Sequence, residues 1–153
     1  MNLQSILVAT DFSDCSGVAL QTAIALAHGS GTKIILLHVI NTKRVNTLCE
    51  YLGEEEDRIV TGLRERAQEQ MAKFLKRWAP KGVEVDTMVA VGAPFQEIAV
   101  IARELAVDLI AIGGYGPAGR GPIEEVFFGS TAEKVVRLLP CPVLCVPGDG
   151  KTA

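Results

Sequence analysis

The chain has 153 residues and a mass of 16.3 kDa, the length of one domain. Its 15 basic and 18 acidic residues give a net charge of −3, which argues against a broad surface for nucleic acid or anionic lipid, because such a surface needs an excess of Lys and Arg. Hydrophobic residues at 48% and charged residues at 22% are typical of a globular chain and not of a disordered one.

Membrane and secretion signals are not evident. No run approaches the roughly 18 apolar residues that a membrane-spanning helix needs. The first residues, MNLQS, lack the basic segment of a signal peptide and lead directly into an apolar run. We therefore expect a cytoplasmic protein without a membrane or nucleic-acid partner.

The four cysteines include no C-x-x-C pair. Cys141 and Cys145 flank an apolar run, and in a strand they would be about 13 Å apart, whereas a disulfide allows at most about 7 Å between Cα atoms. We expect the cysteines to act as small buried apolar residues.

The chain begins with an apolar run at 5–9, SILVA, which predicts a strand. Ser13 or Asp14 can cap the helix that follows, in which apolar residues recur at helical spacing. Gly29 and Gly31 are expected to end this helix.

The second strand is predicted at 33–40. Residues 41–56 are polar and form the longest segment without clear periodicity, and we expect this segment to be mobile. A long helix is predicted over 57–79, with Trp78 on its apolar stripe. Residues 83–91 alternate apolar and polar, which predicts a strand at the edge of a sheet.

The remaining elements continue the alternation of helix and strand. Pro94 is suited to the first position of a helix. After it, the pattern predicts a strand at 108–113, a glycine-rich loop at 113–122, a helix at about 123–139 and a last strand at 142–146.

This alternation predicts an α/β fold with a parallel sheet and helices on both of its faces. Ligands of such sheets bind beyond the carboxyl ends of the strands, at the topological switch point. If the strand order is 3-2-1-4-5, the residues Ala9-Thr10-Asp11 meet the glycine loop from Gly113 there. We expect one domain over 1–147 and a short frayed tail at 148–153.

The segment 113–131, GGYGPAGRGPIEEVFFGST, holds six glycines. Glycine lets backbone amides approach a ligand closely, and successive amides form an anion-binding nest. Ser130 and Thr131 add hydroxyl donors. The segment therefore predicts a phosphate-binding loop; the alternative is a flexible surface loop without a ligand.

Other motif readings are weaker. Residues 114–119 fit G-x-G-x-x-G but follow the fourth strand, whereas the dinucleotide fingerprint belongs after the first. A receiver domain needs an Asp where Gly92 stands. His28 and His38 do not suggest a metal centre, and no nucleophile–base set or carboxylate pair is evident.

Four segments carry a resemblance to a known family: ILVATDFS at 6–13, LLHV at 36–39, DLIAIGGYG at 108–116 and GSTAEKVVRLLPCPVLCV at 129–146. Over nearly its whole length the chain resembles the universal stress protein family. The resemblance implies a Rossmann-like five-stranded parallel sheet in the order 3-2-1-4-5, and a homodimer that pairs through the last strand, 142–146.

The glycines resemble those of the family's ATP-binding class, with a lengthened loop. If Gly113 and Gly116 form the first pair, twelve residues precede Gly129, three more than in the family motif. Starting from Gly116 and Gly119 restores the spacing, but we favour the first register because Gly113 ends the strand. The extra residues add Arg120, which could reach a phosphate.

The resemblance also implies roles for individual residues. Asp11 would lie near the ribose or a metal ion, Val39 would contact adenine through its backbone, and Ile112 would pack on the nucleoside. Ala9 stands where many members have Pro. The phosphates would be held by Gly113, Gly116, Gly129, Ser130 and Thr131.

These inferences predict a cytoplasmic ATP-binding regulatory or stress-response protein that acts as a nucleotide-dependent switch, with Mg²⁺ as a further ligand. No strong base is evident, so it would be at most a slow ATPase or autokinase. The alternative is a dimeric interaction module of the same fold that does not bind nucleotide.

Overall fold

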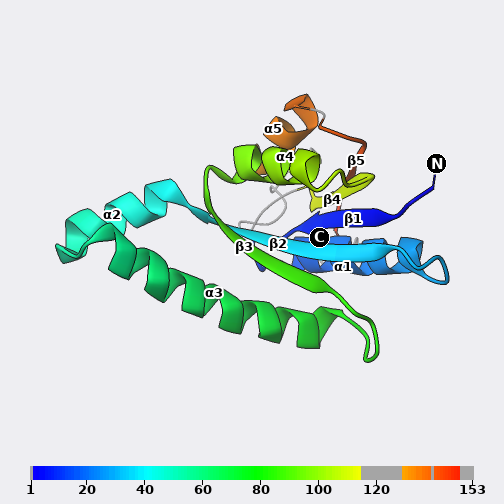
Figure 1. Cartoon of the computed structure of the whole chain (residues 1–153), viewed down its shortest axis with the longest axis horizontal. Coiled ribbons are helices and arrows are strands. Elements are labelled where there is room, and N and C mark those ends of the chain that lie inside the picture. Colours follow the sequence, from blue (N-terminus) through cyan, green and yellow to red (C-terminus); the bar gives the residue numbers. More distant parts are fainter. Residues whose placement is uncertain (1, 115–128, 139, 149–153) are drawn as a thin grey trace, which may run out of the picture.

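Five parallel strands form one sheet in the order β3-β2-β1-β4-β5 (Figure 1). The computed structural model describes residues 2–114, 129–138 and 140–148. The predicted α/β fold and strand order are confirmed. The strands are β1 (Ser5–Ala9), β2 (Lys33–Asn41), β3 (Asp86–Gly92), β4 (Leu109–Gly113) and β5 (Val143–Val146).

The burial of each strand follows from its place in the sheet. β1 is central, and its residues Ile6, Leu7 and Val8 are fully buried, as a strand covered on both faces requires. β3 lies at an edge, as its alternating sequence predicts. It begins at Asp86 and not at 83, because Gly82 adopts a positive φ of 87° and the chain is still turning there.

Helices cover both faces of the sheet, with α1 and α3 on one side and α4 and α5 on the other (Figure 1). Ser13 caps α1 by accepting a hydrogen bond from the Ser16 N–H at 3.3 Å. The predicted start of the last helix, 123–128, lies outside the described residues. The helices are α1 (Asp14–Ala27), α2 (Thr42–Leu52), α3 (Glu56–Trp78), α4 (Pro94–Glu104) and α5 (Ser130–Leu138).

The expectation of a segment without regular periodicity at 41–56 was wrong, because most of it is the helix α2. The Asn41 side chain caps it by accepting from the Lys43 N–H at 3.0 Å, and Gly53 ends it with a φ of 64°. Only Val45 is buried, although Val45, Leu48, Cys49 and Leu52 recur at the helical spacing i, i+3, i+4 and i+7. Val45 and Cys49 pack against α3.

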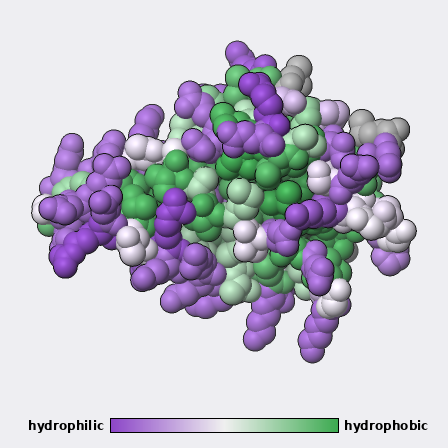
Figure 2. Space-filling view, viewed as in Figure 1, coloured by the Kyte–Doolittle hydropathy of each residue, from purple (hydrophilic) through white to green (hydrophobic). Residues whose placement is uncertain are grey.

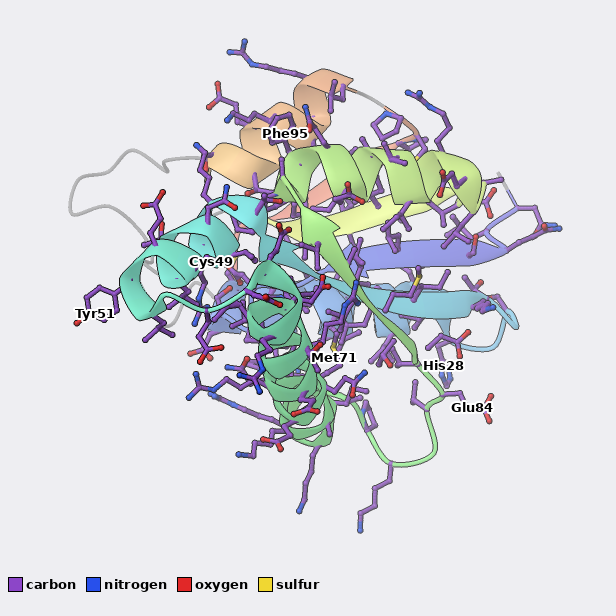
Figure 3. The ribbon with its side chains drawn as sticks, turned by 60° about the vertical axis from the view of Figure 1, so that its left-hand side comes forward. His28, Cys49, Tyr51, Met71, Glu84 and Phe95 are labelled. Carbon is purple, nitrogen blue, oxygen red and sulfur yellow. The ribbon has the colours of Figure 1, made fainter. Side chains whose placement is uncertain are left out.

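Together α2 and α3 form an arm that projects from the sheet (Figure 1). Tyr51 points outward at its tip (Figure 3) and is 85% exposed. Farther along α3, Met71 and Phe74 are buried against the sheet. The arm is therefore anchored at one end and solvated at the other.

All four cysteines are free thiols. Cys15 is buried as expected, while Cys49, Cys141 and Cys145 are only half-buried. Desolvation raises the pKa of the Cys141 and Cys145 thiols above the usual range. Within the described part of the chain, no helix has both the length and the apolar character needed to cross a bilayer.

Candidate functional site

A cavity of about 220 Å³ opens at the carboxyl ends of β1, β2 and β4, where α4 and α5 begin. This is the topological switch point, where the chain leaves β1 toward β2 on one side and β4 lies on the other. The position is the one that the sequence analysis predicts for a ligand.

The inner part of the cavity is apolar. It is formed by side chains from three strands and from α4, all of them at most 9% exposed, and its surface suits a flat apolar group better than a charged one. These residues are Ala9, Leu37, Val39, Ile98 and Ile112.

The outer part is formed by the start of α5, where Gly129, Ser130 and Thr131 line the cavity. The Glu133 N–H donates to the Gly129 carbonyl at 3.0 Å, so the helical hydrogen bonds begin there. The first amides of a helix have no partner within the helix, and the helix dipole adds partial positive charge. This end of the cavity is therefore suited to an anion.

Gly113 brings the end of β4 directly against the start of α1. A Cβ at this position would lie 2.8 Å from Cys15 Sγ and 3.2 Å from the Ser16 backbone nitrogen. Packing alone thus requires a glycine here, apart from any contact with a ligand. Gly113 and Ser16 both line the cavity.

The turn between β1 and α1 is held by buried hydroxyl groups. Ser16 Oγ donates to the Ser13 carbonyl at 2.8 Å, so the Thr10 hydroxyl, 2.8 Å from Ser16 Oγ, donates to Ser16. Thr10 Oγ1 in turn accepts from the Phe12 N–H at 2.9 Å. These bonds hold Phe12 at a φ of 66°, a conformation that a bulky residue rarely adopts.

Asp11 lies in the same turn, exposed at the mouth of the cavity. One of its carboxylate oxygens accepts from the Ser13 N–H at 3.0 Å. The carboxylate is therefore oriented by its own backbone and stays open to solvent. Among the described residues no group of three or more His, Cys, Asp or Glu could hold a metal ion.

His38 connects β2 to this turn. Its Nδ1 lies 2.8 Å from the Thr10 carbonyl oxygen, which only accepts, so Nδ1 carries a proton and donates. The ring packs on Phe12 at 4.3 Å between centroids. Burial lowers the His38 pKa below 6.5, and the charge of Arg44 acts in the same direction, while the bond to Thr10 and the charge of Asp11 oppose it. His38 is therefore neutral at pH 7.

The structure brings most of the predicted site residues to this one cavity. Gly116 and Arg120 lie outside the described residues. The predicted residues that line the cavity are Ala9, Asp11, Val39, Ile112, Gly113, Gly129, Ser130 and Thr131. That they bind a ligand stays a prediction.

Sequence reasoning missed several other lining residues, among them His38, Pro94 and Ile98. The strand order 3-2-1 puts the end of β2 beside the end of β1, so His38 could have been placed from the order alone. Ile98 is one of the buried apolar residues of α4. It reaches the cavity because Pro94 starts α4 close to the same edge of the sheet.

Comparison with known sequences gives a consistent result. The model of the universal stress protein family matches residues 2–147. Universal stress protein MJ0577 of Methanocaldococcus jannaschii is 30% identical over 155 residues, which covers 94% of each chain. Universal stress protein YxiE of Bacillus subtilis is 34% identical over 149 residues, covering 92% of this chain and 97% of the relative.

Solved structures share the fold. Hypothetical protein MJ0577 superposes with a TM-score of 0.78 at 31% identity, over 95% of this chain and 96% of that one. An Archaeoglobus fulgidus universal stress protein in complex with dAMP gives a TM-score of 0.64 at 23% identity, over 95% and 99%; at that identity the likeness concerns the fold. With its sheet order, its cavity at the switch point and the family match over nearly its whole length, the chain belongs to the universal stress protein family.

Proposed function

We propose that this protein binds an adenine nucleotide, ATP with Mg²⁺, in the cavity at the switch point, and acts as a cytoplasmic regulatory or stress-response protein. The observation that carries the proposal is the juxtaposition of an apolar pocket with the start of α5 in one cavity. A nucleotide has the same two-part character, with an apolar base joined through a sugar to an anion.

The two parts of the cavity suggest the orientation of the nucleotide. The base and sugar would pack between Val39 and Ile112, beside Ala9, where the cavity is apolar and buried. The phosphates would face the amides at the start of α5 and the hydroxyls of Ser130 and Thr131. Gly113 would let the ligand approach the end of β4, while Gly116 and Arg120 stay predicted contacts outside the described residues.

The residues present fit Mg²⁺ bound together with phosphate. Mg²⁺ is commonly held by one or two carboxylates with phosphate oxygens and water, and Asp11 is an exposed carboxylate at the mouth of the cavity. The ion would screen the charge of the phosphates as they meet Asp11. No further ligand from the described residues is required for that role.

Structural relatives support the class of ligand. One universal stress protein structure contains dAMP, and another contains cAMP, at a TM-score of 0.58 and 24% identity. Both ligands are adenine nucleotides. We therefore propose an adenine nucleotide for this chain too, and ATP among them because its glycines resemble the ATP-binding class.

The site favours binding over rapid hydrolysis. General base catalysis needs a group that can take a proton from water within hydrogen-bonding distance. His38 donates through Nδ1 to Thr10, which leaves Nε2 as its basic nitrogen, and burial lowers the pKa of the ring, so that it is a weak base. We therefore propose a nucleotide-dependent switch that is at most a slow ATPase or autokinase.

Calorimetric titration of the purified protein with ATP, ADP, AMP and adenosine tests the proposal. Ser130→Asp is the informative variant, because an acidic residue in the first turn of α5 favours the helix but repels a phosphate. We expect the variant to fold and to lose at least about tenfold in affinity for ATP, about 1.4 kcal/mol. Ser130→Asn, similar in size and uncharged, is the control.

A bulky residue at Gly129 provides a second test, because it would fill the entrance beside α5. We expect a folded Gly129 variant to lose ATP binding. Unchanged ATP affinity in both the Gly129 and the Ser130→Asp variants would contradict the site assignment. No binding of any nucleotide by the wild-type protein would favour the alternative, an interaction module that does not bind nucleotide.

We also propose a homodimer that pairs through β5, at the edge of the sheet. The Ile110 N–H donates to the Pro142 carbonyl and the Gly114 N–H to the Val146 carbonyl. The backbone N–H and C=O groups of even-numbered residues in β5 therefore point toward β4, and those of Val143 and Cys145 point to the open edge. Antiparallel pairing of two such edges would use these groups.

Sedimentation analysis of Cys145→Pro tests this dimer. Proline removes the outward N–H but is tolerated on an edge strand, so we expect the folded variant to be monomeric. Cys145→Ala keeps the N–H and serves as the control, which should remain dimeric. A monomeric wild-type protein, or a dimeric Cys145→Pro variant, would contradict pairing through β5.

A further inference from the structure

The other edge of the sheet is formed by β3, which is longer than β5 and therefore offers more backbone groups for unwanted pairing with another chain. β3 has seven residues, and its segment 87–92, TMVAVG, contains no charged side chain. An apolar, uncharged edge strand is a template for pairing with another chain. The space-filling view shows apolar residues gathered over the middle of this face, with hydrophilic side chains around them (Figure 2).

The ladder identifies which backbone groups of β3 are open. The Lys33 N–H donates to the Gln4 carbonyl, and the Thr10 N–H donates to the Leu37 carbonyl, so odd-numbered residues of β2 face β1. His38 therefore faces β3, and its register partner is Val89. In a parallel ladder the bonds of His38 go to the neighbours of Val89. The N–H and C=O groups of 87, 89 and 91 consequently point away from the sheet.

One of these open groups is occupied by a side chain from α3. The Arg64 guanidinium donates to the Val89 carbonyl oxygen at 2.9 Å. Val89 lies in the middle of the strand, so a partner strand would have to displace this bond. The same guanidinium supplies a positive charge to the part of the edge, residues 87–92, that has no charged side chain of its own.

The position of Arg64 on α3 supports this role. It lies four residues after Val60 and three before the buried Ala67, which places it on the apolar side of the helix that faces the sheet. An apolar residue would be expected there from packing alone. Arg64 is exposed instead, and its long side chain reaches over the edge of β3.

We propose that Arg64 closes the β3 edge against a second copy of this chain. Self-association would otherwise be open to both edges of the sheet, and two usable edges allow open-ended growth where one allows only a closed pair. Charged residues are a common means by which edge strands avoid such pairing. The closure of β3 does not depend on nucleotide binding, and growth beyond a pair is expected only where β5 also pairs.

Light scattering coupled to size-exclusion chromatography, over a wide range of protein concentration, tests the proposal. For Arg64→Ala we expect a mass that rises with concentration above the wild-type value. Arg64→Met, which keeps the length of the side chain without its donors, should behave in the same way. Arg66→Ala removes the same charge from an exposed position on the same helix and should leave the mass unchanged.

A second substitution locates the new contact. Thr87 is exposed and its N–H points to the open edge, so Thr87→Pro blocks pairing there with little loss of packing. Adding it to Arg64→Ala should restore the wild-type mass. Adding Cys145→Pro instead should leave the concentration-dependent association in place, which separates this contact from any pairing through β5.

Two results would overturn the proposal. One is an unchanged mass for both Arg64→Ala and Arg64→Met at every concentration. The other is association that Thr87→Pro fails to reverse, since the contact would then lie elsewhere. Circular dichroism of each variant verifies that the helices of the wild-type fold are retained.

Discussion

Thr10 is 5% exposed, and its hydroxyl is hydrogen-bonded on both sides. Thr10→Val preserves the shape of the side chain but leaves the Phe12 N–H without an acceptor and Ser16 Oγ without its donor. Unpaired buried groups of this kind cost about 1–3 kcal/mol. We therefore expect the free energy of unfolding, measured by urea denaturation, to fall by about that amount.

Thr22→Val is the matched control for this substitution. The Thr22 hydroxyl donates to the Val18 carbonyl one turn earlier in α1, and that carbonyl also belongs to the helical hydrogen-bond pattern. The change should cost no more than about 0.5 kcal/mol. Equal losses for the two variants would mean that the turn does not depend on the hydroxyl of Thr10.

His38 should make stability depend on pH in the acid range. Burial, with a smaller effect of Arg44, lowers its pKa in the folded protein below 6.5, so the unfolded chain takes up a proton first as the pH falls. The contribution of neutral His38 to the free energy of unfolding is therefore fully present above pH 6.5, and it decreases as the pH falls from there toward the folded-state pKa.

Urea denaturation between about pH 5 and pH 8 measures this dependence. His38→Gln removes the titrating ring, so we expect its curve of stability against pH to be flatter than that of the wild type. His28→Gln controls for the loss of a histidine as such. Parallel wild-type and His38→Gln curves would show that another group causes the acid dependence.

At the scale of whole elements, two helical glycines should respond in opposite ways to alanine. A Cβ at Gly17 would overlap the Trp78 ring, whereas Gly62 has open space around it. Overpacking costs about 1–3 kcal/mol, while Gly to Ala in an exposed helix stabilises by about 0.5–1 kcal/mol. We expect the thermal midpoint to fall for Gly17→Ala and to rise for Gly62→Ala.

These midpoints can be compared by differential scanning calorimetry under one set of conditions. Each substitution serves as the other's control, since both add a single methyl group within a helix. A rise of the midpoint for Gly17→Ala would show that α1 and α3 separate at little cost.

The elements with long periodic patterns could be predicted from the sequence, whereas the shorter helix α2 was missed. The strands and α3 bury whole runs or stripes, which the pattern of apolar residues records. α2 buries Val45 alone and depends on α3 and on the Asn41 cap. Its apolar stripe of Val45, Leu48, Cys49 and Leu52 spans only two turns among polar residues, which is a much shorter signal than the stripe of α3.

The residues of the candidate site that lie at strand ends could be predicted from the sequence, whereas those that depend on helix packing could not. Ala9, Asp11 and Gly113 lie at strand ends, where topology alone places a ligand. Ile98 reaches the cavity through the packing of α4, and a helical stripe does not reveal which of its residues approaches a cavity. Gly113 also lines the cavity and at the same time allows β4 to pack closely against α1, so one glycine serves both the site and the packing.

At the scale of the whole molecule, a bound nucleotide should stabilise the folded chain against unfolding. Ligand at 100 times its Kd contributes about 2.7 kcal/mol, which raises the thermal midpoint of a domain of this size by several degrees. Mg-ATP should give such a shift for the wild type and a smaller one for Ser130→Asp at the same concentration. Equal shifts for the two proteins would indicate binding away from the start of α5.

The chain contains one tryptophan, and its surroundings make it a selective optical probe. Trp78 packs on Gly17 and near Phe74, with the Arg77 guanidinium 4.9 Å above the ring. This cluster lies on the α1–α3 side of the sheet, next to Ser16 of α1, which also lines the cavity. Its fluorescence therefore reports the docking of α3 on α1, and a change in emission on adding a ligand would mean that the start of α1 responds to the ligand.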